Sequence, residues 1–272
     1  MWSLVTQSAA NNAVFETEEL STYGAIVSKL LESSSVILKC IMNFVINGGT
    51  AITKEEVSGA MEAMFRSKLV GCLVESARTY GANLSPHCTA NIVNVMCELV
   101  LSTTAFLKQF ADAQGLEAID DLPMGVFHPT RGGNTDASAA AGGSAAGGLD
   151  QYKLDAMISG LQISSQLARN SEKYYSSLIS VFTAQKLIAM MTETNVAVVA
   201  KVCNLVGNLC RHSDRFYSTM CTMVKIKQAN GKSVPRNMLD LLAWCCGHED
   251  ASIRKFASFA GKVHGFSIQQ YN

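Results

Sequence analysis

The chain has few prolines and few charged residues. It holds four prolines and 16% charged residues in 272, and its formal net charge is zero. Scarce proline favours helix, because proline interrupts helices. A neutral chain offers no excess of positive charge to nucleic acid or to an anionic membrane, so we expect neither as a partner. The hydrophobic share of 48% argues for a folded core and against a disordered chain.

Long apolar runs and targeting signals are also missing. The longest candidate, Val36–Ile46, is interrupted by Lys39 and Asn43 and is shorter than the roughly 18 residues of a membrane span. The first residues, Met1–Leu4, lack the basic start and apolar core of a signal peptide. Nine cysteines without such a signal indicate reduced, mostly buried thiols. We therefore expect a cytoplasmic protein.

Motifs for catalysis and metal binding are lacking as well. Gly231-Lys232-Ser233 resembles the end of a phosphate-binding loop, but Ile226 stands where that motif requires glycine. No Cys-x-x-Cys pair occurs, and Cys203 and Cys210 share one helical face, which favours core packing over zinc. The adjacent His87 and Cys88 lack a geometry that would activate the thiol. We predict no enzyme activity, no metal and no cofactor.

One segment changes composition abruptly. Residues 125–148 consist largely of glycine, alanine and serine, which cannot bury enough apolar surface to order a backbone. We interpret this segment as a disordered insertion. It divides the chain into N-terminal helical repeats over 1–123, a flexible linker over 124–149 and C-terminal repeats over 150–272.

Apolar residues at helical spacing predict a series of helices on both sides of the linker. The expected helices are Tyr23–Leu31, Ser35–Ile46, Lys54–Leu73, Cys88–Phe110, Leu116–Leu122, Leu149–Arg169, Glu172–Val181, Thr183–Met191, Val196–Cys210, Phe216–Lys227, Asn237–Cys246 and Ser252–Val263.

The most informative stretch is Lys186–Arg211, where two apolar helical faces are separated by a polar break at Thr192–Asn195. Neither face can bury itself alone, so the segment must stack between similar units, as in an α-solenoid. When the sequence is compared with itself after a shift of 110 or 54 residues, similar residues are aligned, which indicates an internal repeat. Both offsets exceed whole repeats by amounts that insertions at Met124–Gly148 and Lys225–Arg236 could supply.

The pattern around Leu187–Cys210, and again around Leu239–Gly261, resembles the armadillo/HEAT repeat. His248–Ala257 fits the turn and helix start of such a repeat, and Asp250 is suited to cap the helix that follows. The resemblance implies an all-α, right-handed, armadillo/HEAT-like α-solenoid. Such folds usually serve as protein-binding scaffolds.

A narrower match involves Val202–Ser213 with Phe216-Tyr217, followed by Ile253–Gly261. These residues resemble the C-terminal armadillo-type region of Fused-family serine/threonine kinases. The resemblance implies a regulatory piece that acts with kinesin-like or other cytoskeletal proteins. No kinase motif is present. The chain therefore reads as a fragment, a truncated gene model or a short relative, and the alternative is a full-length active kinase whose catalytic domain lies outside it.

The candidate binding residues are Asn204, Asn208, Arg211 and His212. In peptide-binding armadillo proteins, an asparagine at the position of Asn208 lies on the concave face and holds a peptide backbone through its amide. The equivalent positions in the other matching segments are Glu98 and Lys262, so a continuous asparagine ladder is missing. The alternative is that Asn208 caps or bridges neighbouring repeats.

Two further possibilities concern partners. Lysines and arginines make the C-terminal half locally basic, which suits an acidic protein segment. The chain could instead be a helical adaptor or a dimerisation module, with an apolar patch near Phe256, Phe259 and Phe266.

Overall fold

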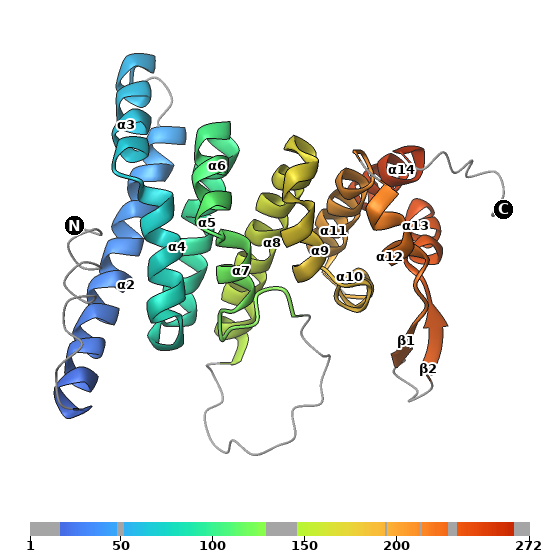
Figure 1. The fold of residues 1–272 in the computed structure, drawn as a ribbon, viewed down its shortest axis with the longest axis horizontal. Coiled ribbons are helices and arrows are strands. Elements are labelled where there is room, and N and C mark those ends of the chain that lie inside the picture. Colours follow the sequence, from blue (N-terminus) through green and yellow to red (C-terminus); the bar gives the residue numbers. More distant parts are fainter. Residues whose placement is uncertain are drawn as a thin grey trace. The chain divides into compact units, whose positions relative to one another are not determined.

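The computed structural model describes residues 17–47, 52–128, 146–193, 195–212, 214–227 and 233–263, and these residues are helical apart from one small hairpin (Figure 1). The described elements are α2 (Thr17–Asn47), α3 (Lys54–Arg66), α4 (Leu69–Tyr80), η2 (Gly81–Asn83), α5 (Pro86–Ser102), α6 (Thr104–Asp112), α7 (Gly115–Asp120), α8 (Ala146–Asn170), η3 (Glu172–Tyr174), α9 (Tyr175–Val181), α10 (Ala184–Met191), α11 (Val196–Leu209), η4 (Asp214–Phe216), α12 (Tyr217–Cys221), β1 (Val224–Lys227), β2 (Ser233–Arg236), α13 (Met238–Cys246) and α14 (Ala251–Val263).

The chain forms two compact units, and the boundary between them falls within α8. The first unit holds the described residues up to Val126 together with α8 up to Gly160. The second holds the end of α8, from Leu161, and everything described after it. Of the Gly/Ala/Ser segment predicted to be disordered, residues 129–145 lie outside the described residues. Its two ends are ordered instead, because Val126 and Phe127 are fully buried and α8 already begins at Ala146.

The first unit is a stack of helical repeats. Helices α3, α4 and α5 form one repeat, and α5 packs along α2 on one side. Helices α6 and α7 begin the next repeat and pack on α4. The core between these layers is apolar and includes the fully buried side chains Leu73, Met96, Phe106 and Phe110.

The boundaries inside this unit differ from the prediction at two places. The segment expected as one helix, Lys54–Leu73, is divided because Lys68 adopts a left-handed conformation with φ 52°. The segment Cys88–Phe110 is divided at Thr103, whose extended backbone starts α6 while its hydroxyl accepts a hydrogen bond from the Phe106 amide. Neither break contains glycine or proline, so the residue types at these positions do not predict the end of a helix.

Elsewhere, two helices predicted separately, Tyr23–Leu31 and Ser35–Ile46, form a single helix. Helix α2 runs without interruption through Glu32–Ser34, where a break was expected. The Ser33 hydroxyl donates to the Lys29 carbonyl at 3.1 Å, and the Ser35 hydroxyl donates to the Glu32 carbonyl at 2.8 Å. Serines that bond back to their own helix are compatible with its interior, which explains why the polar run does not end it.

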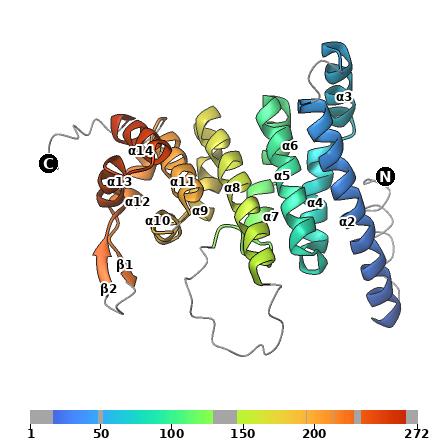
Figure 2. The same ribbon diagram turned by 180° about the vertical axis from the view of Figure 1, so that it is seen from behind.

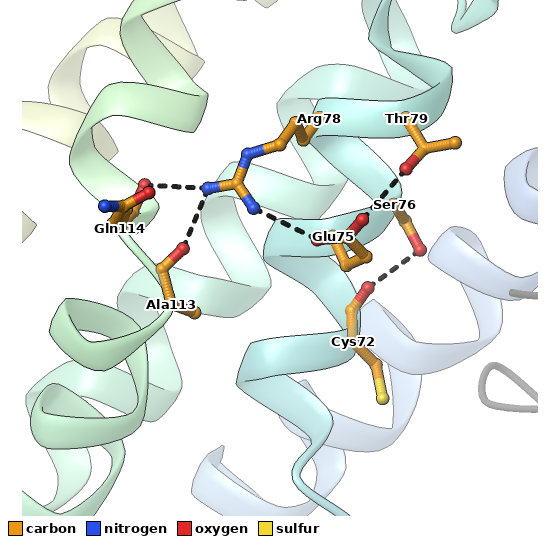
Figure 3. A network of polar contacts seen from close by, with 7 residues as sticks. All are labelled: Cys72, Glu75, Ser76, Arg78, Thr79, Ala113 and Gln114. Carbon is orange, nitrogen blue, oxygen red and sulfur yellow. Dashed lines mark hydrogen bonds and ion pairs between the residues drawn. The ribbon is translucent and has the colours of Figure 1, made fainter.

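Arg78 on α4 ties the two layers of the first unit together (Figure 3). One guanidinium nitrogen donates to Glu75 Oε2 at 3.0 Å, and the other donates to the Ala113 carbonyl at 2.9 Å. Ala113 lies directly after α6, so its carbonyl belongs to the unpaired end of that helix. A cation at this end satisfies the carbonyl and interacts favourably with the helix dipole.

The second unit contains two further repeats, α9–α10–α11 and η4/α12–α13–α14. Their third helices, α11 and α14, lie side by side in both views (Figures 1 and 2). Gly207 permits this approach, because a Cβ there would lie 2.6 Å from the Phe259 ring. The predicted cap is confirmed, since Asp250 Oδ1 accepts from the amides of Ser252 at 2.8 Å and Ile253 at 3.0 Å.

A β-hairpin separates α12 from α13, where the sequence predicted an inserted segment. Strands β1 and β2 are antiparallel, with Val224 opposite Arg236. The helix expected over Phe216–Lys227 is therefore wrong beyond Cys221, because Thr222 is already extended, with ψ 124°. The hairpin is an addition to a helical fold, and the all-α, armadillo-like class predicted from the sequence is confirmed. None of the helices within the described ranges is long and apolar enough to cross a bilayer.

Candidate functional site

Asn208 lies near the end of α11 and is almost fully buried. Its side-chain amide donates to the Asn204 carbonyl at 3.0 Å, and its own main-chain carbonyl accepts a hydrogen bond from the Tyr175 hydroxyl at 2.9 Å. Tyr175 begins α9, so Asn208 helps to join the first and third helices of its repeat. This contact lies within one repeat, so the alternative that Asn208 bridges neighbouring repeats stays a prediction. Peptide binding by the Asn208 amide also stays a prediction.

The other three predicted residues differ in exposure. Asn204 is half-buried beside Asn208, whereas Arg211 and His212 are exposed in the turn after α11. His212 Nε2 lies 2.9 Å from the Arg169 carbonyl at the end of α8. Because a carbonyl can only accept, Nε2 carries the proton in this contact. Arg211 is thus the predicted residue whose charged group is most open to a ligand.

A second polar row lies on α5 in the first unit. It consists of His87, Asn91, Asn94 and Glu98, which are spaced by three or four residues and so share one face of the helix. Asn94 and Glu98 precede Asn204 and Asn208 by the 110-residue offset found in the sequence. We name these four residues the α5 row.

Side chains from both neighbouring helices hold the α5 row. Lys39 of α2 donates to Asn91 Oδ1 at 3.1 Å, and the Asn91 amide nitrogen is 3.2 Å from His87 Nε2. Since Oδ1 already accepts from the lysine, the amide nitrogen donates and the imidazole nitrogen accepts. From α8, the Ser159 hydroxyl donates to Asn94 Oδ1 at 2.6 Å.

Glu98 is the member of the row that has a buried oxygen without a hydrogen-bond donor. Its Oε2 atom is buried and has no hydrogen-bond partner in the structure. Burial raises the pKa of the Glu98 carboxyl, and the positive charge of Lys39 opposes that rise. A buried acceptor without a donor is costly, so a rotation of the half-buried Glu98 side chain that brings Oε2 to a ligand's donor would be favoured. The sequence pointed to this residue only as an interruption of the asparagine ladder.

Two cysteines of the second unit, Cys203 and Cys210, have raised pKa values. A hydrogen bond with Cys245 and burial raise the pKa of the Cys203 thiol. Desolvation by burial raises the pKa of Cys210 to about 12. Thiols held in their protonated form are poor nucleophiles and poor metal ligands. In the part of the chain that the structure describes, no three potential metal-binding side chains are grouped.

Comparison with known proteins finds solved structures of similar fold, but it does not assign the chain to a family. No family model matches the sequence, and no curated protein matches it. Among solved structures, one engineered protein is 12% identical with a TM-score of 0.52, over 83% of this chain and 78% of the other. A second engineered protein is 11% identical with a TM-score of 0.52, over 96% of this chain and 97% of the other.

A designed armadillo repeat protein, solved in complex with the peptide (KR)4, is 11% identical with a TM-score of 0.49, over 96% of this chain and 98% of the other. At such identities a likeness concerns the fold alone. What the present chain binds must be argued from its own side chains.

Proposed function

We propose that this chain is a non-catalytic protein-interaction scaffold that binds an extended peptide segment along the third helices of its repeats. The observation that carries the proposal is the buried, unpaired Glu98 Oε2 within the α5 row. Stacked repeats present extended surfaces of this kind, and their usual ligands are proteins.

The α5 row suits a peptide in extended conformation. Asn94 retains amide hydrogens after its oxygen is taken by Ser159, so it can donate to a peptide carbonyl. Glu98 can accept a main-chain N–H or the ammonium of a lysine. Contacts to the peptide backbone hold a segment in place, and a carboxylate beside it selects for positive charge.

The predicted residues of the second unit contribute in a complementary way. Arg211 is exposed and can pair with a carboxylate of a protein partner. Asn208 is more readily assigned to holding α9 against α11, because both its amide and its carbonyl are hydrogen-bonded inside the repeat. We expect Arg211→Ala to weaken binding of acidic segments while leaving folding unchanged.

Selection of random peptides on the purified full chain tests the proposal. Fluorescence anisotropy then compares a selected peptide on the original chain and on Glu98→Ala. Losing a hydrogen bond to a charged group costs about 1.5–3 kcal/mol, so the dissociation constant should rise by roughly tenfold or more. The matched control is Glu55→Ala, on the exposed face of α3. Equal affinity of both variants for every selected peptide would contradict binding at the α5 row.

A finer part of the proposal concerns kinship with the regulatory region of Fused-family kinases, and with it a cytoplasmic, cytoskeletal role alongside kinesin-like partners. It is supported by the residue pattern of Val202–Ser213 and Ile253–Gly261. Of these, Val202–Leu209 lie in α11 and Ile253–Gly261 lie in α14. Co-sedimentation with a kinesin-like motor on microtubules tests the role. The length of the native transcript tests the alternative that an active kinase domain precedes this segment. A short transcript and no co-sedimentation would remove this part and leave the scaffold proposal standing.

A further inference from the structure

Helix α2 uses one face to pack on α5 and leaves its opposite face apolar and exposed. Val27, Leu31, Leu38 and Met42 are buried on the inner face. The outer face carries large apolar side chains that are each about half exposed. They are Ile26, Leu30, Val36, Ile37, Ile41 and Phe44.

This outer face is unlike the end of a finished stack. Terminal repeats of solenoid proteins normally present a polar surface to water. Scattered exposed apolar residues are ordinary, but a contiguous set along one helix marks an interaction site. The exposed fractions reach 56% at Ile37 and 60% at Phe44.

The spacing of the outer face identifies the geometry of its partner. Residues 26, 30, 33, 37, 40 and 44 alternate in steps of four and three, which is the seam of a coiled coil. We name these six residues the α2 seam. Side chains at this spacing fit between those of another helix that runs nearly parallel or antiparallel to α2. A helix is therefore the expected partner element.

We propose that the α2 seam binds a second copy of this chain, with the two α2 helices antiparallel about a two-fold axis near Ser35. In that arrangement Ile26 meets Phe44 of the other copy, Leu30 meets Cys40 and Ser33 meets Ile37. Each pair occurs twice, as a two-fold interface requires. The large Leu30 and Ile37 side chains each lie opposite a small one, which allows close packing across the seam.

A parallel pair of the same helices is disfavoured by the same side chains. It would place Ser33 against Ser33 and Phe44 against Phe44. The first pair would put two polar hydroxyls in an apolar interface, and the second would put two large rings in the space of one. In the antiparallel pair no like charges oppose each other, because Lys29 flanks the seam near Asn43 of the other copy. Like-charge contacts would have cost affinity.

The available area is sufficient for a dimer of moderate affinity. Six large apolar side chains at half exposure offer on the order of 600 Å² per copy, or about 1,200 Å² in all, which is the lower limit for stable interfaces. We therefore expect association in the micromolar range.

Sedimentation equilibrium of the full chain between about 1 and 100 µM tests the proposal. We expect the average mass to rise from one copy towards two, with the dissociation constant inside this range. Ile37→Glu should remain monomeric throughout, because it places charges at the centre of the seam. The matched control is Leu101→Glu, since Leu101 is an exposed apolar residue on α5, at 45%, and this variant should still dimerise. Unchanged circular dichroism would show that Ile37→Glu still folds.

Mild oxidation tests the orientation. Leu30→Cys should form an inter-chain disulfide with the native Cys40 of the other copy, whereas the unmodified chain should form no Cys40–Cys40 link. The proposal is overturned if the original chain stays monomeric at 100 µM, as it would if another segment or protein covers the seam. It is also overturned if Ile37→Glu leaves the association unchanged or if Cys40 links to Cys40.

Discussion

The hydroxyl of Tyr175 donates a 2.9 Å hydrogen bond to the main-chain carbonyl of Asn208. Tyr175 is fully buried, and the Asn208 carbonyl, in the last turn of α11, also accepts a hydrogen bond from the Arg211 amide at 3.2 Å. A side chain from the first helix of the repeat therefore completes the hydrogen bonding of the third helix. The two residues are 33 positions apart in the sequence, so this contact exists only in the folded repeat.

Tyr175→Phe should lower the free energy of unfolding by about 0.5–1.5 kcal/mol, because the Asn208 carbonyl loses the hydroxyl donor and keeps the Arg211 amide. Urea denaturation monitored by circular dichroism measures the change. Tyr174→Phe is the matched control, since its ring is half-buried and it should change stability by less than about 0.5 kcal/mol. Equal losses in both variants would show that the hydrogen bond contributes little.

Gly207→Ala should destabilise the second unit by about 1–3 kcal/mol, because the added methyl overlaps the Phe259 ring. Thermal unfolding measures the effect. Gly71→Ala is the control: Gly71 also lies within a helix, and a Cβ there meets nothing within 4 Å. Alanine has the higher helix propensity, so this control should be neutral or stabilising by up to about 1 kcal/mol. A neutral Gly207→Ala would mean that α11 and α14 separate without cost.

Arg78→Ala should destabilise the first unit by roughly 1 kcal/mol, because the Ala113 carbonyl at the end of α6 loses a charged donor. Hydrogen exchange of the α6–α7 amides should quicken at the same time. Arg66→Ala is the matched control, since Arg66 is an exposed arginine paired with Glu62 one turn away in its own helix. Exposed pairs of this kind contribute little, so we expect less than about 0.5 kcal/mol. Equal effects would argue against a role for Arg78 between layers.

The stability of the second unit should fall at alkaline pH. Burial raises the pKa of Cys210 from its ordinary value of 9.0 to about 12 in the folded protein. A folded pKa above the unfolded one contributes stability that is complete below pH 9 and is lost as pH rises towards 12. Urea midpoints measured from pH 7 to pH 11 should therefore fall above pH 9. Cys210→Ala should flatten this decline, and an unchanged slope would assign it to other groups.

Several features could be predicted from the sequence because they depend on neighbours along the chain. Asp250 was recognised as a cap because its carboxylate needs only the amides two and three residues ahead. The apolar faces of Lys186–Arg211 indicated stacking because a helical face with that spacing must be covered. The residues Lys225–Arg236 were identified as an insertion but not as a hairpin, since the strands stabilise each other only when paired.

The candidate site was harder to predict, because its properties come from residues distant in sequence. Asn208 looks like a ladder asparagine by its position, yet its burial follows from the packing of its repeat around α11. Glu98 breaks the expected pattern, yet its buried Oε2 atom is the unpaired acceptor of the α5 row. Lys39 and Ser159 join the α5 row from 52 and 65 positions away, and no local pattern reveals them.

By itself, the sequence determined that this protein is a stack of helices, because helical propensity, end caps and the spacing of apolar residues all act within a few turns of chain. Tertiary structure alone decided which polar atoms are satisfied, where Lys68 and Thr103 divide the helices, and which face of α2 stays uncovered. Those outcomes depend on desolvation and close contact between segments, and these forces operate only once distant residues have been brought together.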